Sequence, residues 1–396
     1  MHIQNFTLKR IVLWGLIARV IAFVAILLFS SDLSEGFISS DVINDDIRYL
    51  TGGEAYARLA SSLIDNRAFA IAFSSLDNIY LSDRVEIWYW YICIGLYLFK
   101  SEIVLKLFNI VFALLTISCI YKIADKLYGR KVASMASMLY AIIPYPVFFC
   151  CFLYKDQLYT LVTLYILQIA LYYGASLKNK HLVYIALLLG LSVLLRSGLA
   201  VIVAAIVLLI IKKEGGYKFS SVKMILPLII GIIGVIAFLY YSMDSIKLKM
   251  LAYVYNYELS SGGMVQYFLI KSPIQIWKYP FSMLFMTLLP VNLSMTMNSW
   301  NDLVCCLNVA AFPVAFGNFL YFFQFKMKKD KFWWYMQLLY LITVVTSIEI
   351  FRHSYYLLPF TIIFFSIFYI RIKWKMVYLG LTFMPVGIYY FLFLFH

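Results

Sequence analysis

The sequence predicts an all-α integral membrane protein that forms a single domain over residues 1–396 and crosses the bilayer about eleven times. Hydrophobic residues make up 64% of the chain and charged residues only 13%, and no soluble core could bury this much apolar surface. The apolar residues gather in long runs, as in transmembrane helices. The net charge of +14 comes mostly from lysine and arginine between these runs, which indicates membrane topology rather than nucleic-acid binding.

The first predicted span covers residues 11–29 and carries Arg19 near its middle. A cation at this depth costs several kcal/mol unless it finds a partner or water. We therefore expect Arg19 to face the protein interior. The six cysteines lie in apolar surroundings without the spacing of a metal site, and we expect thiols rather than a disulfide framework.

The next apolar run, from Trp88 to Phe99, has only 12 residues and is too short to cross comfortably. Its Trp and Tyr residues are typical of the membrane interface, and we interpret it as a re-entrant or interfacial helix. If it crossed, the basic segment from Lys122 to Lys131 would lie outside, against the positive-inside rule. The remaining predicted spans are 103–121, 132–150, 157–174, 182–196, 198–211, 224–241, 303–325, 332–349, 354–370 and 376–395.

Most lysines and arginines then fall in short loops on one side of the membrane, which places the amino terminus in the cytoplasm and the carboxyl terminus outside. Two larger regions face outward, residues 31–86 and residues 242–302. The first of them holds ten of the 19 acidic residues. Within it, the spacing of Tyr56, Leu59 and Leu63 predicts an amphipathic helix on the membrane interface.

Four groups of charged residues are expected at the outer ends of separate helices. They are Asp45 with Asp46, Lys155 with Asp156, Arg196, and Arg352 with His353. A carboxylate beside an acceptor hydroxyl can act as a general base, and a carboxylate pair can hold Mg²⁺ or Mn²⁺ against a phosphate. Arginine and lysine can bind the phosphate itself.

Each group also has a structural interpretation that stays open. The first aspartate pair is compatible with a helix cap or a solvated turn, and the Lys155–Asp156 pair with an interfacial ion pair. Arg196 can snorkel from a short span. Arg352 and His353 can form a local salt bridge with Glu349.

Several weak sequence signatures occur in a recognisable order. They are Asp45, Asp46 and Tyr49, the run from Glu54 to Leu63, Leu105–Asn109, Tyr128–Ala133, Pro144 and Pro146 before Tyr154–Asp156, Gly190–Arg196, and Phe351–Pro359 with Arg352, His353 and Tyr356. In this order they resemble the GT-C glycosyltransferases, multi-span enzymes that use polyprenyl-phosphate sugars and include the protein O-mannosyltransferases and the aminoarabinose transferases. The resemblance covers residues 11–211, and residues 340–365 more loosely.

The resemblance implies a GT-C-like membrane glycosyltransferase on the periplasmic side of a bacterial inner membrane. Its expected partners are a polyprenyl-phosphate-linked sugar donor, a glycan or lipid-linked acceptor such as polysaccharide or lipopolysaccharide, and membrane lipids, without nucleic acid. A divalent cation, Mg²⁺ or Mn²⁺, is compatible with this chemistry. The implied catalytic acids are Asp45, Asp46, Glu54 and Asp156, and the implied lipid-phosphate ligands are Lys155, Arg196, Arg352, His353 and Tyr356.

One departure and two rival functions stay open. The family often has an Asp-Glu pair where this chain has Asp45-Asp46, which leaves open which first-loop acid is catalytic. An O-antigen repeat-unit polymerase, which uses polyprenyl-pyrophosphate oligosaccharides, would share the compartment and the lipid carrier. A lipid-linked sugar flippase is the other rival, and a transporter is expected to show an internal repeat and polar residues at mid-membrane. The chain shows neither beyond Arg19.

Overall fold

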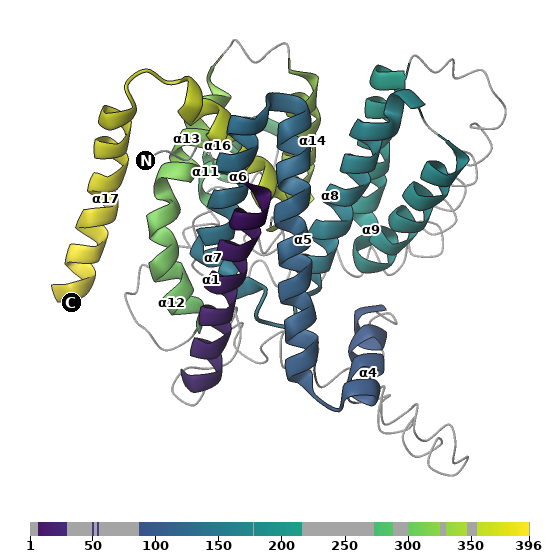
Figure 1. Cartoon of the computed structure of the whole chain (residues 1–396). Coiled ribbons are helices and arrows are strands. Elements are labelled where there is room, and N and C mark those ends of the chain that lie inside the picture. Colours follow the sequence, from purple (N-terminus) through teal and green to yellow (C-terminus); the bar gives the residue numbers. More distant parts are fainter. Residues whose placement is uncertain are drawn as a thin grey trace.

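Helices make up the regular structure of the protein (Figure 1). The computed structural model describes residues 7–29, 50, 54, 87–176, 178–215, 273–287, 300–324, 330–346 and 355–395. Over these residues it contains 13 α-helices and four short 3₁₀ helices, and no strand. The all-α fold class is therefore confirmed for the described part of the chain.

The first half of the chain contributes the main bundle. Its helices are α1 (Leu8–Phe29), α4 (Ile87–Phe99), α5 (Glu102–Tyr128), α6 (Arg130–Ile142), α7 (Pro144–Phe149), α8 (Lys155–Tyr173) and α9 (Asn179–Gly215), with η2 (Gly174–Ser176) after α8. Helix α5 packs against α6 and α8, α8 packs against α9, and α1 packs against α5 and α6. These contacts bury the apolar faces of α5, α6 and α8.

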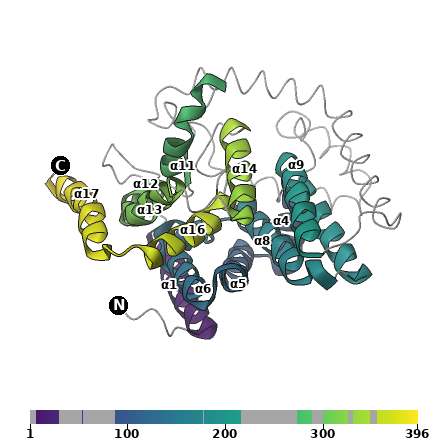
Figure 2. The ribbon, with the colours of Figure 1, turned by 90° about the horizontal axis from the view of Figure 1, so that it is seen from above.

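The second half adds a further layer of helices. They are η4 (Pro273–Lys278), α11 (Tyr279–Thr287), α12 (Trp300–Asn308), η5 (Val309–Ala311), α13 (Phe312–Phe322), α14 (Lys331–Thr346), η7 (Tyr355–Leu357), α16 (Leu358–Arg371) and α17 (Lys375–Phe395). Helix α16 joins the two halves because it packs against both α6 and α13. Figure 2 shows α17 at the margin of the molecule, where it packs against η5 and α13.

Glycine and proline set the sharp changes of direction. Gly129, between α5 and α6, has φ +88, a conformation that glycine adopts without steric cost. Pro144 ends α6, because the residue before a proline is driven out of the helical region, and Ile143 has ψ 130. The single span predicted over residues 132–150 is therefore two helices, α6 and α7. The span predicted over residues 303–325 is one helical segment, Asp302–Phe322, in which a 3₁₀ turn, η5, comes before Pro313 in the first turn of α13.

One predicted interruption is wrong. The sequence predicts two spans, 182–196 and 198–211, with Arg196 between them. The structure has one helix there, α9, of 37 residues, which corresponds to about 55 Å if it were straight. No proline lies between residues 179 and 215, so helical hydrogen bonding continues past Arg196, which lies inside the helix.

The protein is a multi-pass membrane protein by its helices. Four described helical segments are long and apolar enough to cross a bilayer: Leu8–Phe29, Glu102–Tyr128, Asp302–Phe322 and Lys375–Phe393. Helix α4, with 13 residues, is not among them, in agreement with its interpretation as a non-spanning helix. The predicted total of about eleven spans stays a prediction, and the span predicted over residues 224–241 lies outside the described residues.

Arg19 faces the protein interior, as predicted, and is 0% exposed. Its guanidinium donates hydrogen bonds to the carbonyl oxygens of Gly15 (3.0 Å), Ala141 (3.2 Å) and Tyr140 (3.4 Å). Tyr140 and Ala141 belong to the last turn of α6, where the helix dipole and the unpaired carbonyls attract a cation. The buried charge thus ties α1 to the end of α6. The six cysteines, all of them within the described residues, are buried and form no disulfide.

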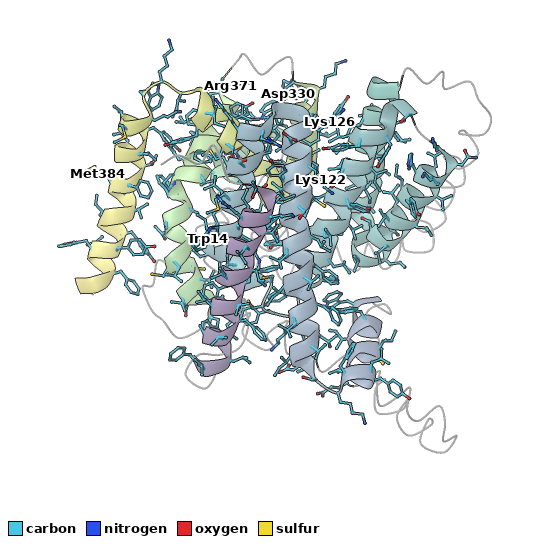
Figure 3. All side chains as sticks on the ribbon, in the orientation of Figure 1. Trp14, Lys122, Lys126, Asp330, Arg371 and Met384 are labelled. Atoms are coloured by element: carbon cyan, nitrogen blue, oxygen red, sulfur yellow. The ribbon has the colours of Figure 1, made fainter. Side chains whose placement is uncertain are left out.

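The two ends of the bundle differ in charge. Figure 3 shows Lys122, Lys126, Asp330 and Arg371 at one end, which we call the basic end. The opposite end carries α4 and the start of α5, and we call it the α4 end (Figure 1). At the basic end, the Tyr128 hydroxyl donates to the Asp330 carboxylate (2.6 Å), and the other Asp330 oxygen accepts from the first turn of α14. Asp330 is therefore the N-cap of α14 and joins it to α5.

Candidate active site at the start of helix α8

Helix α8 begins with a buried carboxylate. Asp156 lies in its first turn and is only 2% exposed, while the preceding Lys155 is half-buried. The positive end of a helix dipole stabilises a negative charge in the first turn. The hydroxyl of Tyr145 in α7 interacts electrostatically with the Asp156 carboxylate. One turn of helix therefore carries the Asp156 carboxylate, which can accept a proton, and the Lys155 ammonium group, which can bind an anion.

The segment that leads into this turn is buried without being helical. Residues Cys150–Tyr154, which we call the α7–α8 link, are all 0–1% exposed. Trp88 Nε1 donates to the carbonyl oxygen of Leu153 (2.8 Å). Asn109 Nδ2 donates to the carbonyl oxygens of Phe152 (2.6 Å) and Tyr154 (3.4 Å). Side chains of α4 and α5 thus contact three link carbonyls, and those of Phe152 and Leu153 precede the first carbonyl that α8 pairs.

A buried hydrogen-bond network connects α8 to a distant part of the chain. The Tyr355 hydroxyl of η7 donates to Gln157 Oε1 (2.6 Å) and lies 3.0 Å from the Tyr140 hydroxyl of α6. Gln157 Nε2 in turn donates to Thr116 Oγ1 of α5 (3.2 Å). Four elements therefore meet one residue after Asp156.

Aromatic rings pack around the same network. The Phe149 ring stacks on Tyr355 (4.2 Å between centroids) and on Tyr154 (4.7 Å). The Tyr356 ring packs edge-on against Tyr159 (5.3 Å), and its hydroxyl is hydrogen-bonded to Thr343 Oγ1 of α14. The rings exclude water, which strengthens the electrostatic interactions beneath them.

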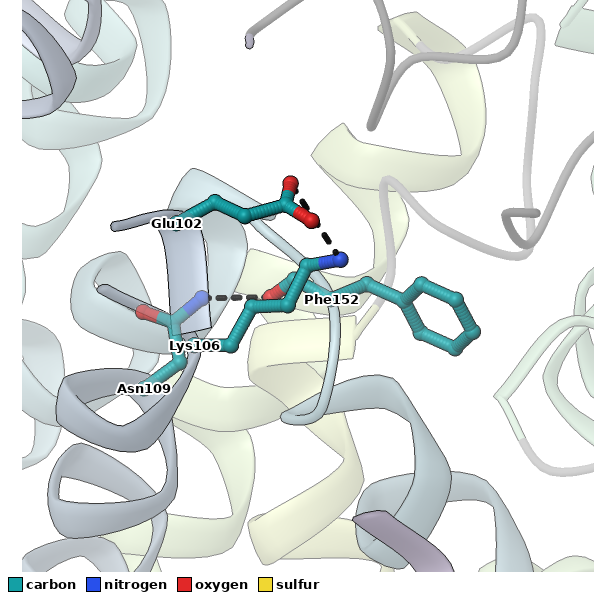
Figure 4. A network of polar contacts seen from close by, with 4 residues as sticks. All are labelled: Glu102, Lys106, Asn109 and Phe152. Carbon is teal, nitrogen blue, oxygen red and sulfur yellow. Dashed lines mark hydrogen bonds and ion pairs between the residues drawn. The ribbon is translucent and has the colours of Figure 1, made fainter. Parts of the chain in front are cut away.

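A second buried cation lies beside the link. Lys106 of α5 is 5% exposed, and its Nζ pairs with Glu102 at 3.6 Å (Figure 4). The Lys106 ammonium group also interacts electrostatically with Cys151 of the link. Figure 4 shows Lys106 on the same face of α5 as Asn109, which contacts the Phe152 carbonyl.

The structure brings together some of the predicted residues. Asp156, Lys155 and Tyr356 lie on packed elements, since α8 contacts η7. Arg196 lies in α9, and Glu54 is helical and exposed. Asp45, Asp46, Arg352 and His353 lie outside the described residues. Leu50, from the same predicted outer loop as Glu54, packs against the hydrophobic core.

Several residues of the site were missed at the level of sequence. They are Trp88, Glu102 and Gln157, while Lys106, Asn109 and Tyr355 entered only as parts of a family signature. A signal was present, because Lys106, Asn109 and Gln157 are polar side chains in strongly apolar helices, where such residues are costly and commonly functional. The indole N–H of Trp88 carried no such signal, since tryptophan is common at membrane interfaces.

Among the described residues, no group of three or more His, Cys, Asp or Glu side chains is arranged to hold a metal ion. Asp45 and Asp46, the pair predicted to bind a divalent cation, are not among those residues. Metal dependence therefore stays a prediction from the sequence.

Comparison with known proteins adds one match. Residues 87–241 match the family model described as dolichyl-phosphate-mannose-protein mannosyltransferase. This range begins at α4 and includes the α7–α8 link, Lys155 and Asp156, while η7 lies beyond it. Neither the curated proteins nor the solved structures contain a match to the chain.

Proposed function

Because the chain belongs to the dolichyl-phosphate-mannose-protein mannosyltransferase family of membrane glycosyltransferases, which use a polyprenyl-phosphate-linked sugar donor, we propose that it transfers the sugar to a cell-surface glycan. The reaction takes place on the outer face of the membrane, at the start of α8. The basic end supports this outward placement, because basic residues in short loops favour the cytoplasmic side.

The chemistry asks for two kinds of group. The bond between the sugar's anomeric carbon and the lipid-phosphate oxygen breaks, and the acceptor oxygen forms a new bond to that carbon. Negative charge grows on the departing phosphate while the acceptor hydroxyl loses a proton, so a cation and a base must stand on opposite sides of the sugar. The products are the glycosylated acceptor and polyprenyl phosphate.

The described residues supply both groups. Asp156 is the carboxylate at the site that can accept the acceptor proton, and Asp45, Asp46 and Glu54 of the first outer loop are the predicted alternatives. Lys155 and Lys106 provide positive charge for the lipid phosphate. Arg196, Arg352, His353 and Tyr356 are the further predicted phosphate ligands.

One observation supports this function above the others. A buried aspartate opens α8 within the segment that matches the glycosyltransferase family. The next residue, Gln157, accepts a hydrogen bond from Tyr355, which lies 198 residues later in the chain. A buried charge at such a junction is costly to keep and marks a functional site more often than a structural one.

The test is a reaction with purified protein in lipid nanodiscs. We expect a panel of polyprenyl-phosphate sugars to yield free polyprenyl phosphate when a glycan acceptor is present. Release of polyprenyl pyrophosphate from a pyrophosphate-linked oligosaccharide, with no reaction of the phosphate-linked sugars, would instead identify a repeat-unit polymerase. Movement of the intact donor across a vesicle membrane without either product would identify a flippase.

Asp156→Asn tests the base within this assay. The amide keeps the size of the side chain but cannot accept the proton, and loss of a general base typically costs roughly 10²–10⁴-fold in rate. We expect kcat to fall by that order in protein that still purifies as a monodisperse species. Asp302→Asn, which changes a half-buried acid in the first turn of α12, is the matched control and should keep its activity. Wild-type turnover by Asp156→Asn would move the base to the first outer loop.

A further inference from the structure

We propose that Trp88 and Asn109 are positioning residues for the transfer reaction, because their side chains hold the α7–α8 link and the link sets the place of Lys155 and Asp156. This inference rests on the proposed function of Lys155 and Asp156. It concerns two residues whose contacts are to backbone atoms and which therefore take no direct part in the chemistry.

The link is unusual backbone for this depth in the protein. Its five residues are fully buried, yet it is not helical. Irregular backbone inside a membrane protein persists only where other groups satisfy its N–H and C=O groups. The N–H groups of Cys151 and Phe152 reach back to the carbonyls of α7, at 2.9 Å and 3.4 Å. The carbonyls of Phe152 and Leu153 are bonded by Asn109 and Trp88, and Asn109 adds a contact to the Tyr154 carbonyl at the N-cap of α8.

The two donors come from different helices and approach neighbouring carbonyls. Asn109, on α5, donates hydrogen bonds to the carbonyls on either side of Leu153. Trp88, on α4, donates to the carbonyl of Leu153 itself. Both donors are buried, Asn109 at 0% and Trp88 at 1% exposure. Three consecutive peptide groups are therefore held from two sides, directly before the first turn of α8.

These hydrogen bonds fix the position of the first turn of α8, which carries Lys155 and Asp156. Lys155 follows the last gripped carbonyl by one residue and Asp156 by two. A shift of the link therefore moves both charges together. A displacement of about 1 Å between reacting groups can cost on the order of 100-fold in rate, so the grip on the link affects turnover more than it affects donor binding.

Trp88 also joins two parts of the protein that the sequence keeps apart. Helix α4 follows directly after the acidic outer loop, residues 31–86, in which Asp45, Asp46 and Glu54 are predicted to lie. The indole ring stacks on Tyr91 of the same helix (4.6 Å), which orients the N–H toward the link. The chain that leaves the acidic loop is thus anchored to the segment that precedes Asp156.

The first arm of the test measures turnover. Trp88→Phe keeps an aromatic ring beside Tyr91 but removes the donor, and Asn109→Leu keeps the volume but removes both hydrogen bonds. We expect kcat for polyprenyl-phosphate release to fall roughly ten- to hundredfold in each, with the KM for the donor within about twofold of wild type. Tyr378→Phe, which removes a buried ring hydroxyl bonded to the Pro313 carbonyl, is the matched control and should keep the wild-type kcat.

The second arm reads the position of the site without using activity. Lys155→Cys places a thiol in the first turn of α8, and its alkylation rate by a small reagent is compared in the wild-type, Trp88→Phe, Asn109→Leu and Tyr378→Phe backgrounds. We expect the first two variants to change the rate at least about threefold and the control to leave it unchanged. The native cysteines are buried, and protein without Lys155→Cys gives the background rate.

The outcomes separate the two proposals. Equal alkylation rates in all four backgrounds, with kcat losses no larger than that of Tyr378→Phe, would overturn the positioning role. Absence of polyprenyl-phosphate release by the wild-type protein would overturn the proposed function, while the alkylation rates would still decide whether Trp88 and Asn109 hold the start of α8. If one of the two variants fails to fold, the other carries both arms.

Discussion

At the scale of single residues, three buried charges serve different purposes. Arg19 meets carbonyl oxygens at the carboxyl end of α6, where the helix dipole favours a cation. Asp156 lies at the amino end of α8, where the dipole favours an anion. Lys106 lies in the second turn of α5, where it pairs with Glu102 at 3.6 Å. We propose that its charge also serves the lipid phosphate.

Lys106 is expected to bind the donor rather than support the fold. Lys106→Met removes the charge and keeps the apolar stem, and we expect the KM for the polyprenyl-phosphate donor to rise about ten- to hundredfold, the worth of one charge-assisted hydrogen bond. Lys106→Arg should restore part of the affinity because it restores the charge. The measurement is initial-rate kinetics over a range of donor concentrations.

Glu102→Gln is the control for this prediction. It removes the ion-pair partner of Lys106, at 3.6 Å, but leaves the ammonium in place. A KM close to wild type is expected, since ion pairs with a partly exposed partner contribute little, about 0–1 kcal/mol. If Glu102→Gln and Lys106→Met raised the KM equally, the ion pair itself would be the important feature and Lys106 would have no separate role in donor binding.

At the scale of elements, η7 is bound to the start of α8 by one hydroxyl. Tyr355 bridges Gln157 of α8 and Tyr140 of α6, while its ring stacks on Phe149 of α7. Neighbouring Tyr356 packs on α8 and α14. A short 3₁₀ turn thus holds four helices together, and it does so with groups that are buried and therefore costly to leave without partners.

Tyr355→Phe is expected to destabilise the protein by about 1–3 kcal/mol, because Gln157 Oε1 stays buried and loses its donor. The double variant Tyr355→Phe/Gln157→Leu should lose less than the sum of the two single variants, since removing both partners of a buried hydrogen bond leaves nothing unsatisfied. The stability losses of the single and double variants are compared through the midpoint of thermal unfolding of each purified protein. Strict additivity of the two losses would show that the hydroxyl and the amide act independently.

At the scale of the whole molecule, the basic residues at one end predict an orientation in the membrane. Lys122, Lys126 and Arg371 gather at the basic end (Figure 3), and Lys373 and Lys375 lie in and just after the turn between α16 and α17 at that end. Basic residues in short loops are retained in the cytoplasm. The α4 end, toward which the candidate site lies, is therefore expected to face outward.

Orientation can be tested by thiol labelling of exposed positions. Lys100→Cys, which follows α4, is expected to react with a membrane-impermeant maleimide in intact cells. Lys373→Cys, between α16 and α17, should react only after permeabilisation; both residues are exposed. Labelling of Lys373→Cys but not Lys100→Cys in intact cells would invert the orientation and put the candidate site in the cytoplasm.

The sequence by itself determined the class of the protein and much of its helical structure. Long apolar runs predicted α1, α5, α8, α14, α16 and α17 close to their observed bounds, because a helix that crosses a membrane must satisfy its own backbone and be apolar along its length. The interior position of Arg19 followed from the cost of an isolated charge in lipid. Order of motifs predicted the glycosyltransferase family, which the match over residues 87–241 confirms.

Only the tertiary structure decided which residues meet. Periodicity reports the environment along one helix, but the contact between Gln157 and Tyr355 joins residues 198 apart, and the grip of Trp88 on the Leu153 carbonyl joins residues 65 apart. These contacts depend on how helices pack and on backbone carbonyls that have no sequence signal at all. The same holds for α9, predicted as two spans and found as one helix, since apolarity shows that residues are buried in lipid or protein and not where a helix ends.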